Sequence, residues 1–258
     1  MNETEFSQQR LQTALSPRPV RFYAQVESSS DIALDWLRNG AAAGSVVVAD
    51  EQTRGRGRLG RSWYAPPATA LMLSVVLRPS AAALVQVSMM GALVVCETLE
   101  AFGIRNVGIK WPNDTQIDGR KVCGVLPEVL WDGDRLFGAV LGIGLNVRID
   151  FAGTPFEQTA TSVETVLGKS IDRLELLTTL LERIDDWTAR IESYALFDAW
   201  TERLTTIGQQ VSVNQANGVV TGMAEGVDEH GALLVRDEDG ALQRVIAGDI
   251  ALGSSNGD

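Results

Sequence analysis

The dipeptide Asp118-Gly119 sets the strongest local limit on the fold, because it joins two segments that both have the composition of β-strands. The segment before it ends in K-W-P-N-D-T-Q-I, and the segment after it begins R-K-V-C-G-V-L. Asp-Gly between such segments favours a two-residue hairpin in which both turn residues take positive φ. The turn then sets the pairs across the hairpin, which are Ile117 with Arg120, Gln116 with Lys121, Thr115 with Val122, and Asp114 with Cys123.

This register places a lysine and an aspartate on the same face of the hairpin. Because side chains alternate along a strand, Asp114, Gln116, Lys121 and Cys123 all lie on one side. Lys121 is diagonal to Asp114 at a backbone separation of about 7–8 Å, which two such side chains can bridge. Two interpretations stay open: a small charged substrate between the ammonium and the carboxylate, or a cross-strand ion pair on an exposed sheet face.

The rest of the sequence alternates between strand-like and helix-like segments. Strands are expected at 20–26, 45–49 and 70–78, with a further pair of strands around 135–147, and helices at 31–39, 81–102, 172–191 and 194–204. Ser30 or Asp31 is the expected N-cap of the first helix, and Ser80 that of the second. Near the C-terminus, short Val-rich pieces are separated by N-Q-A-N-G, D-E-H-G and D-E-D-G, which are turn signals. We therefore expect a larger domain at 1–206 and a small antiparallel barrel at 207–258.

A second distinctive stretch, T-R-G-R-G-R-L-G-R-S-W at 53–63, concentrates arginines in a chain of formal net charge −11. Its residues 55–60 match the pattern G-x-G-x-x-G after a predicted strand. The dinucleotide-binding motif, however, opens a helix and is followed about 20 residues later by an acidic residue. Here S-W-Y-A-P-P follows, and no Asp or Glu occurs from Ser62 through Cys96. The pattern therefore does not indicate a dinucleotide site.

Three other interpretations of this stretch remain. An RNA-binding tract would need a wider basic surface than a chain with 33 acidic and 22 basic residues provides. A solvated surface loop is the plain structural alternative. A local anion site is favoured, because Arg56, Arg58 and Arg61 can form bidentate bonds to phosphate or carboxylate oxygens. Glycine entropy and charge repulsion predict that this loop is disordered until a ligand binds.

Composition narrows the chemistry further. Two cysteines are too few for a disulfide framework or a Cys-based zinc site, and the single histidine, His230, belongs to an apparent exposed turn. We therefore predict no metal site, and acid–base chemistry carried out by Lys, Arg, Asp or the substrate itself. The polar N-terminal residues predict no secretory leader and hence a cytoplasmic protein. The apolar run 81–96 is too short to span a bilayer, so no membrane segment is expected.

Together, the arginine-glycine segment and the lysine-bearing hairpin suit the joining of two anions. If a carboxylate attacks the α-phosphate of ATP, charge repulsion opposes the approach. Arginine and lysine aimed at the developing charge lower that barrier, and the reaction needs no histidine and no protein nucleophile. Mg²⁺ is expected to accompany the nucleotide phosphates.

These motifs resemble those of the biotin protein ligases over essentially the full length of the chain. The matching blocks are G-R-G-R-x-G-R-x-W at 55–63, K-W-P-N-D at 110–114, G-R-K-x-x-G at 119–124 and G-I-G-L-N-V at 142–147. The resemblance implies ATP-dependent activation of biotin to biotinyl-5′-AMP, followed by transfer to one lysine of a biotin carboxyl carrier domain. It also implies an α+β fold: a mixed β-sheet flanked by helices, of the class II synthetase-like biotin/lipoate ligase type, followed by a small SH3-like β-barrel.

The resemblance further implies roles for individual residues. Lys121 would contact the biotin carboxyl group and the adenylate, Arg58 would hold the adenylate, and Asp114 would receive the acceptor lysine. Trp63 would pack on the adenine, with Asn146 near that base. The other substrate-binding positions would be Ser29, Ser30, Asp31, Gln52, Arg56, Gly57 and Gly124.

Two departures from the family pattern bear on these roles. The usual Ser-Thr-Asn appears here as Ser29-Ser30-Asp31, so a carboxylate replaces an amide that would bond the ureido ring. That carboxylate can still accept bonds from ureido N–H groups. After Trp63, A-P-P-A-T-A replaces the common S-P-x-G, which predicts a stiffer link beside the adenine pocket.

The sequence also bears on scope and on competing functions. About 25 residues precede the serine-rich motif, too few for a DNA-binding helix-turn-helix domain, so we expect no DNA partner. The oligomeric state, a homodimer included, stays open. The rival functions are a lipoate or octanoate ligase or transferase of the same fold, and a biotin-binding sensor without turnover. The arginine-glycine loop together with K-W-P-N-D favours biotin.

Overall fold

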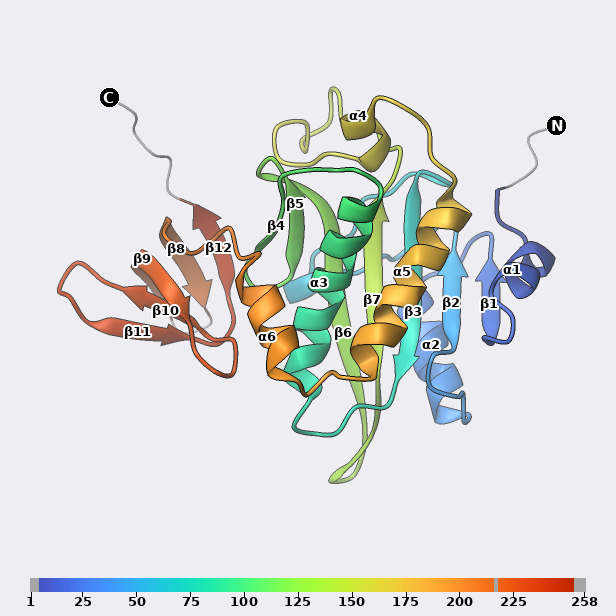
Figure 1. The fold of residues 1–258 in the computed structure, drawn as a ribbon, viewed down its shortest axis with the longest axis horizontal. Coiled ribbons are helices and arrows are strands. Elements are labelled where there is room, and N and C mark those ends of the chain that lie inside the picture. The colour runs from blue at the N-terminus through green and yellow to red at the C-terminus, as the bar shows by residue number, and fades with distance from the viewer. Residues whose placement is uncertain (1–4, 216–217, 253–258) are drawn as a thin grey trace.

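The computed structural model describes residues 5–215 and 218–252, which form a larger α/β part and a smaller β part (Figure 1). The larger part is built on a seven-stranded sheet of order β1-β2-β3-β7-β6-β5-β4. Its strands are β1 (Val20–Tyr23), β2 (Val46–Ala49), β3 (Ala70–Leu77), β4 (Val107–Lys110), β5 (Asp114–Ile117), β6 (Arg120–Asp132) and β7 (Arg135–Asn146). β1 and β2 run parallel, and the other neighbours run antiparallel. The predicted mixed sheet is confirmed, but the pair of strands expected around 135–147 is wrong, because this segment is the single strand β7, paired along its length with β3 and β6.

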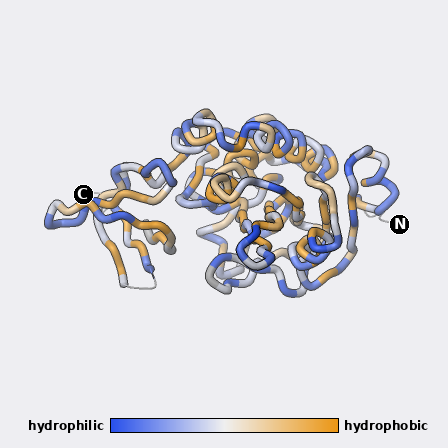
Figure 2. Tube along the Cα trace, turned by 90° about the horizontal axis from the view of Figure 1, so that it is seen from below, coloured by the Kyte–Doolittle hydropathy of each residue, from blue (hydrophilic) through white to orange (hydrophobic). Residues whose placement is uncertain are grey.

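Helices cover both faces of this sheet. They are α1 (Gln8–Ala14), α2 (Ser29–Arg38), α3 (Leu84–Ala101), α4 (Val163–Leu167), α5 (Arg173–Thr188) and α6 (Tyr194–Thr201). Figure 1 shows α3 and α5 crossing one face, with α2 behind the other. Within β2, Val46 and Val48 join the cluster that contains α3 and α5, whereas Val47 packs with Ala33 and Leu37 of α2. An uninterrupted apolar strand is therefore buried on both sides, and Figure 2 shows the apolar stretches gathered toward the middle of the larger part.

Helix α2 begins earlier than predicted. Its N-cap is Ser28, so Ser30 and Asp31 lie in the first turn and the predicted caps are wrong. The helix ends as predicted, with Gly40 at φ +87°, a conformation that glycine adopts without strain. The earlier start turns Ser29 and Ser30 toward the sheet, where both are buried.

Helix α3 is the central apolar helix. It begins at Leu84 rather than near residue 81, and its N-cap is Ala83, so the predicted cap Ser80 is wrong. The hydroxyl of Ser80 instead accepts a bond from the Ala83 N–H and closes a separate turn before the helix. By length and mean hydropathy, 1.4, it could cross a membrane, but 61% of it is buried inside the protein. It packs between the sheet and helices α5 and α6. Its apolar character is therefore accounted for by the core.

The smaller part is an antiparallel sheet of order β11-β10-β9-β8-β12. Its strands are β8 (Gln210–Gln215), β9 (Gly218–Val227), β10 (Leu233–Arg236), β11 (Leu242–Val245) and β12 (Asp249–Leu252). The predicted small antiparallel C-terminal domain is confirmed, and its boundary at 206/207 stays a prediction. His230 lies exposed between β9 and β10, as predicted. Trp111 joins the two parts: its backbone N–H bonds the Thr206 hydroxyl at 2.9 Å, and its ring N–H bonds the Gly231 carbonyl at 2.8 Å.

The hairpin between β5 and β6 forms at the predicted turn. Asp118 and Gly119 have φ of 48° and 75°, as a two-residue turn of this kind requires. Two of the predicted pairs are confirmed, Ile117 with Arg120 and Gln116 with Lys121.

Beyond these pairs the predicted register is wrong, because β6 contains a β-bulge. Thr115 lies opposite Cys123 and Asp114 opposite Gly124, so Val122 is the extra residue. The bulge lets both Val122 and Cys123 enter the core, where each is fully buried. It also brings Gly124, rather than Cys123, to the position across from Asp114.

A buried ionic cluster joins the N-terminal segment to the strands on either side of residues 53–63. The Arg173 side chain is 1% exposed. It contacts Glu5 at 2.7 Å, Asp50 at the end of β2 at 2.9 Å, and the Ala70 carbonyl at the start of β3 at 3.0 Å. Burial opposes ionisation of Glu5, but the hydrogen bonds and charge of Arg173 hold the pKa of Glu5 below its usual value.

Replacing Glu5 by Gln is expected to lower the free energy of unfolding at neutral pH by about 1–3 kcal/mol, because Arg173 loses a carboxylate partner. Since folding lowers the Glu5 pKa, its contribution is complete above the ordinary value of 4.5 and is lost as the pH falls through the lower folded value. Urea unfolding should therefore show the wild-type and Glu5→Gln curves converging in acid. Glu182→Gln, at an exposed position of α5, is the control and should give the wild-type unfolding curve both at neutral pH and in acid. A difference between the wild type and Glu5→Gln that is equally large at neutral pH and in acid would contradict this account.

Candidate active site

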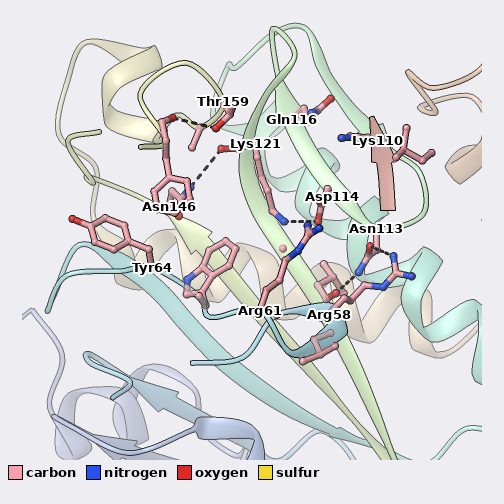
Figure 3. A pocket seen from close by; sticks show the side chains of 18 of the residues that line it. Arg58, Arg61, Tyr64, Lys110, Asn113, Asp114, Gln116, Lys121, Asn146 and Thr159 are labelled. Carbon is pink, nitrogen blue, oxygen red and sulfur yellow. Dashed lines mark hydrogen bonds and ion pairs between the residues drawn. The ribbon is translucent and has the colours of Figure 1, made fainter. Parts of the chain in front are cut away.

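A cavity of about 470 Å³ lies beside the β5–β6 hairpin, which contributes part of its lining (Figure 3). Its volume is typical of small-molecule sites. The arginine-glycine segment, the K-W-P-N-D turn, the hairpin, residues 151–160 and the end of β7 contribute its walls. Its charged and amide groups include Arg58, Arg61, Lys110, Asp114, Lys121 and Asn146.

Lys121 and Asp114 face each other inside this cavity (Figure 3). Their ammonium and carboxylate groups are 2.7 Å apart, and the two side chains are 36% and 31% exposed. The backbone of Lys121 is held by residues 159–161, through an N–H bond to the Thr159 carbonyl at 2.8 Å and a bond from the Thr161 N–H at 2.9 Å. The predicted proximity of the lysine and the aspartate is confirmed, and both groups are within reach of a ligand.

The two cysteines take no part in this site. The prediction that Cys123 shares a face with Lys121 is wrong, because the bulge turns it into the core. Burial raises the pKa of Cys123 far above its usual value and raises that of Cys96 to about 12. Neither thiol is therefore a nucleophile at neutral pH.

Trp63 lies directly on the backbone of the sheet. Gly124 and Gly144 are paired across β6 and β7, and a Cβ atom at either would come within 2.9 or 2.7 Å of the Trp63 ring. Glycine at these two positions therefore makes room for the indole. Trp63 lines the large cavity on one side and a smaller one, of about 30 Å³, on the other.

Arg56 is held by two carboxylates at the smaller cavity. It bonds both oxygens of Asp31, at 2.8 and 2.7 Å, and also reaches Glu128 at 3.1 Å. The hydrogen bonds that Arg56 donates to Asp31, with a further contribution from Glu128, raise the pKa of Arg56 above its usual value. Arg54 likewise pairs with Glu27, at 3.1 Å. The charge repulsion expected within the loop is therefore offset by carboxylates from elsewhere.

The loop also closes on itself through its backbone. The Gly57 N–H bonds the Arg61 carbonyl at 2.7 Å, and the Trp63 N–H bonds the Gly55 carbonyl at 2.9 Å. A short 3₁₀ turn, η1 (Arg58–Gly60), lies at its tip. The loop has a defined conformation, and the prediction that it orders on ligand binding stays a prediction.

Arg58 is positioned by the K-W-P-N-D turn. Its guanidinium donates to the side-chain oxygen of Asn113 at 3.1 Å. The side-chain NH₂ of Asn113 donates in turn to the backbone carbonyl of Val125 (Figure 3). Asn113 is 2% exposed. The turn that supplies Asp114 to the cavity therefore also orients Arg58, which explains why both motifs occur in one sequence.

The far wall of the large cavity is aromatic. The ring of Tyr64 is 6.4 Å from that of Phe151 and 5.7 Å from that of Phe156. Beside it, the Asn146 amide donates to the Thr161 carbonyl at 3.1 Å, and its own oxygen is buried without a hydrogen-bond partner among the described residues. This end of the cavity offers aromatic faces and a polar group, as a nucleobase would require.

Comparison with known proteins agrees with this geometry. Residues 22–146 match the biotin/lipoate A/B protein ligase family, and residues 206–253 match the biotin protein ligase C-terminal domain. The chain is 34% identical to the biotin–[acetyl-CoA-carboxylase] ligase of Paracoccus denitrificans, over 84% of this chain and 94% of that one. It is 31% identical to the bifunctional ligase/repressor BirA of Bacillus spizizenii, over 94% of this chain and 77% of that one.

This chain belongs to the biotin protein ligase family. A solved structure agrees: the biotin protein ligase of Aquifex aeolicus in complex with biotin and ATP superposes with a TM-score of 0.78 at 29% identity, covering 91% of this chain and 98% of that one. The fold and enzyme class expected from the sequence, a biotin ligase with a C-terminal β domain, are confirmed.

The structure brings the predicted ligase residues together in two adjoining cavities. The large one contains Gly57, Arg58, Trp63, Asp114, Lys121, Gly124 and Asn146, and the small one contains Ser29, Ser30, Gln52, Arg56, Trp63 and Gly124. Sequence reasoning missed two polar residues, Asn113 and Ser74. Asn113 could have been found from its place in K-W-P-N-D, and Ser74 as the one polar residue within the apolar strand β3.

Asp31 is the predicted substrate-binding residue that lines neither cavity. Both of its oxygens bond Arg56, and its expected role as an acceptor for ureido N–H groups stays a prediction. The helix start explains its position, because Asp31 lies on an exposed side of the first turn, while Ser29 and Ser30 face the sheet.

Asp31→Ala should make the arginine-glycine loop easier to cleave by trypsin in the absence of biotin and ATP. Loss of an exposed ion pair worth about 1 kcal/mol increases local opening by roughly five-fold. Asp35→Ala, at an exposed position one turn further along α2, is the matched control and should match the wild type. Equal rates of cleavage of all three proteins after the arginines between residues 54 and 61 would show that Asp31 does not hold the loop in place.

Proposed function

We propose that this protein carries out a two-step biotin ligation. In the first step, a carboxylate oxygen of biotin attacks the α-phosphorus of ATP, giving biotinyl-5′-AMP and pyrophosphate. In the second, the amine of an acceptor lysine attacks the acyl carbon, forming an amide and releasing AMP. The observation that carries this proposal is the cavity that combines Lys121 and Asp114 with two arginines of the loop, next to a small polar pocket.

The residues of the large cavity suit the first step, because its barrier is the approach of two anions. The Lys121 ammonium is already paired with a carboxylate at 2.7 Å, so an incoming biotin carboxylate can take the place of Asp114 without uncovering the charge. Arg58 and Arg61, on the loop side of the same cavity, are placed to contact the phosphates. Fixed charges of this kind stabilise the developing transition-state charge more than water does.

Asp114 suits the second step. When Lys121 bonds the substrate, the Asp114 carboxylate becomes available to orient the neutral amine of the acceptor lysine or to take its proton. The acceptor we propose is the biotin carboxyl carrier domain of a biotin-dependent carboxylase. This proposal is supported by the name of the Paracoccus denitrificans relative, a biotin–[acetyl-CoA-carboxylase] ligase.

We propose that Mg²⁺ enters with the nucleotide. Among the described residues, no group of three or more His, Cys, Asp or Glu side chains could hold a metal ion. The donor set of the large cavity is mainly cationic and suits phosphate oxygens rather than a bare cation. The ion would supply charge neutralisation on the phosphates.

The competing substrate is lipoate or octanoate, since the matching family model includes lipoate ligases. The polar lining of the small cavity, with Ser29, Ser30 and Gln52, favours a ureido ring over an apolar acyl end. The test is incubation with ATP, a carrier domain and either biotin or lipoate, followed by intact-mass measurement of the carrier. Modification by lipoate and not by biotin would overturn the proposal, and pyrophosphate release without any carrier modification would reduce it to adenylation alone.

Lys121→Ala is expected to slow biotin-dependent pyrophosphate release by about 10²–10³-fold, the loss typical for one preorganised contact to the developing charge. Arg58→Ala should still form the adenylate but retain it for a shorter time, as measured by chasing labelled biotinyl-AMP with unlabelled biotin. Lys169→Ala removes an exposed lysine that lines neither cavity and serves as the control. Unchanged yield and lifetime in both site variants would remove these two assignments.

A further inference from the structure

Behind the small cavity, three buried serine hydroxyls form a continuous chain of hydrogen bonds. Ser30 and Ser74 are 3.1 Å apart, and Ser74 and Ser29 are 2.8 Å apart. The chain ends on the side-chain carbonyl of Gln52, which is 3.0 Å from the Ser29 hydroxyl. The serines are 7%, 0% and 3% exposed, in the order Ser30, Ser74, Ser29, so water does not complete their bonding.

The direction of every bond in this chain is determined. The Gln52 oxygen also accepts the backbone N–H of Ser29 at 2.7 Å, which identifies it as the oxygen rather than the nitrogen of the amide. A carbonyl oxygen only accepts, so the single hydroxyl proton of Ser29 points at Gln52. The bond between Ser29 and Ser74 must then be donated by Ser74, and the bond between Ser74 and Ser30 by Ser30.

This arrangement is built into the packing of the sheet. Ser74 of β3 is paired with Gly142 of β7, and a Cβ atom at residue 142 would come within 2.9 Å of the Ser30 hydroxyl. The absence of a side chain at Gly142 therefore leaves the space that Ser30 uses to reach Ser74. At the other end, the amide nitrogen of Gln52 donates to the sulfur of Met72, at 3.3 Å, which is a weak acceptor that a better one can replace.

We propose that Ser74 is a positioning residue that sets the hydrogen-bonding polarity of the small cavity. Ser74 does not line the cavity, but Ser29, Ser30 and Gln52 do. Because the Ser30 hydroxyl donates its hydrogen bond to Ser74, the Ser30 oxygen can present only lone pairs to a ligand. The Ser29 hydroxyl, which donates to Gln52, is restricted in the same way. Gln52 presents a donor. Two acceptors and one donor complement a cyclic urea, which has two N–H groups and one carbonyl oxygen.

This inference rests on the proposed function, and it predicts a selectivity as well as an affinity. A ring in which oxygen replaces one N–H group, a cyclic carbamate, would place a lone pair against the Ser30 lone pairs. Without Ser74, the Ser30 hydroxyl has no acceptor behind it and can turn to donate to that oxygen. Loss of Ser74 should therefore weaken binding of the urea and improve the relative binding of the carbamate.

The experiment compares desthiobiotin, which has a cyclic urea, with its oxazolidinone analogue, by calorimetry without ATP. The wild-type protein should prefer the urea, and Ser74→Ala should lower the ratio of the two affinities by about ten-fold, the equivalent of one hydrogen bond. Ser74→Cys, nearly isosteric and a weak hydrogen-bonding group, should lower the ratio in the same direction and provides the test if the alanine variant does not fold. Ser45→Ala is the matched control, because Ser45 is equally buried and its hydroxyl has no partner among the described residues.

The outcomes separate this inference from the proposed function. An unchanged ratio in both Ser74 variants, including equal weakening of the two ligands, would mean that Ser74 only supports the structure and would overturn the inference. If the wild-type protein binds neither desthiobiotin nor biotin, the proposed function itself fails. Ser45→Ala should reproduce the wild-type ratio, and a changed ratio there would show that any buried serine has this effect.

Discussion

The site depends on the close approach of the Trp63 indole to the backbone of β6 and β7. Only glycine allows it, because a side chain at Gly124 or Gly144 would overlap the ring. The contact fastens the C-terminal end of the arginine-glycine segment to the sheet and divides the two cavities. Two residues earlier on the same face, Gly142 leaves space for Ser30. Gly142 and Gly144 of β7 therefore leave one face of the strand without side chains, so that Ser30 and the Trp63 indole can pack directly against its backbone.

Two cations of this site are paired with carboxylates, in a chain whose formal net charge is −11. Arg56 lies between two carboxylates, and Lys121 pairs with Asp114. In the proposed reaction, an anionic substrate would compete with these protein carboxylates instead of entering an uncompensated positive field. Such exchange keeps the cations positioned before the reaction, which is the condition under which fixed charges contribute most to catalysis.

Local signals were sufficient for much of the fold, and they failed where a contact between distant segments decided the outcome. The hairpin turn and its first two pairs followed from Asp118-Gly119, since turn chemistry is a property of neighbouring residues. The bulge at Val122 did not follow from local signals, because it depends on the burial of Val122 and Cys123 in the core. Helices α1 and α4 were missed because they are only 7 and 5 residues long, and too little of each is buried for a periodic pattern to be visible.

By itself, the sequence determined the mixed sheet, the small C-terminal β domain, the family and the proximity of Lys121 to Asp114, because alternation, turn residues and contiguous motifs express these features locally. Only the tertiary structure decided which groups those residues bond. Asp31 became a partner of Arg56, 25 residues away, and Glu128, 72 residues from Arg56, joined it. Ser74 met Ser29 across 45 residues. These pairings depend on strand order and on the helix start, which bring together side chains that no local pattern connects.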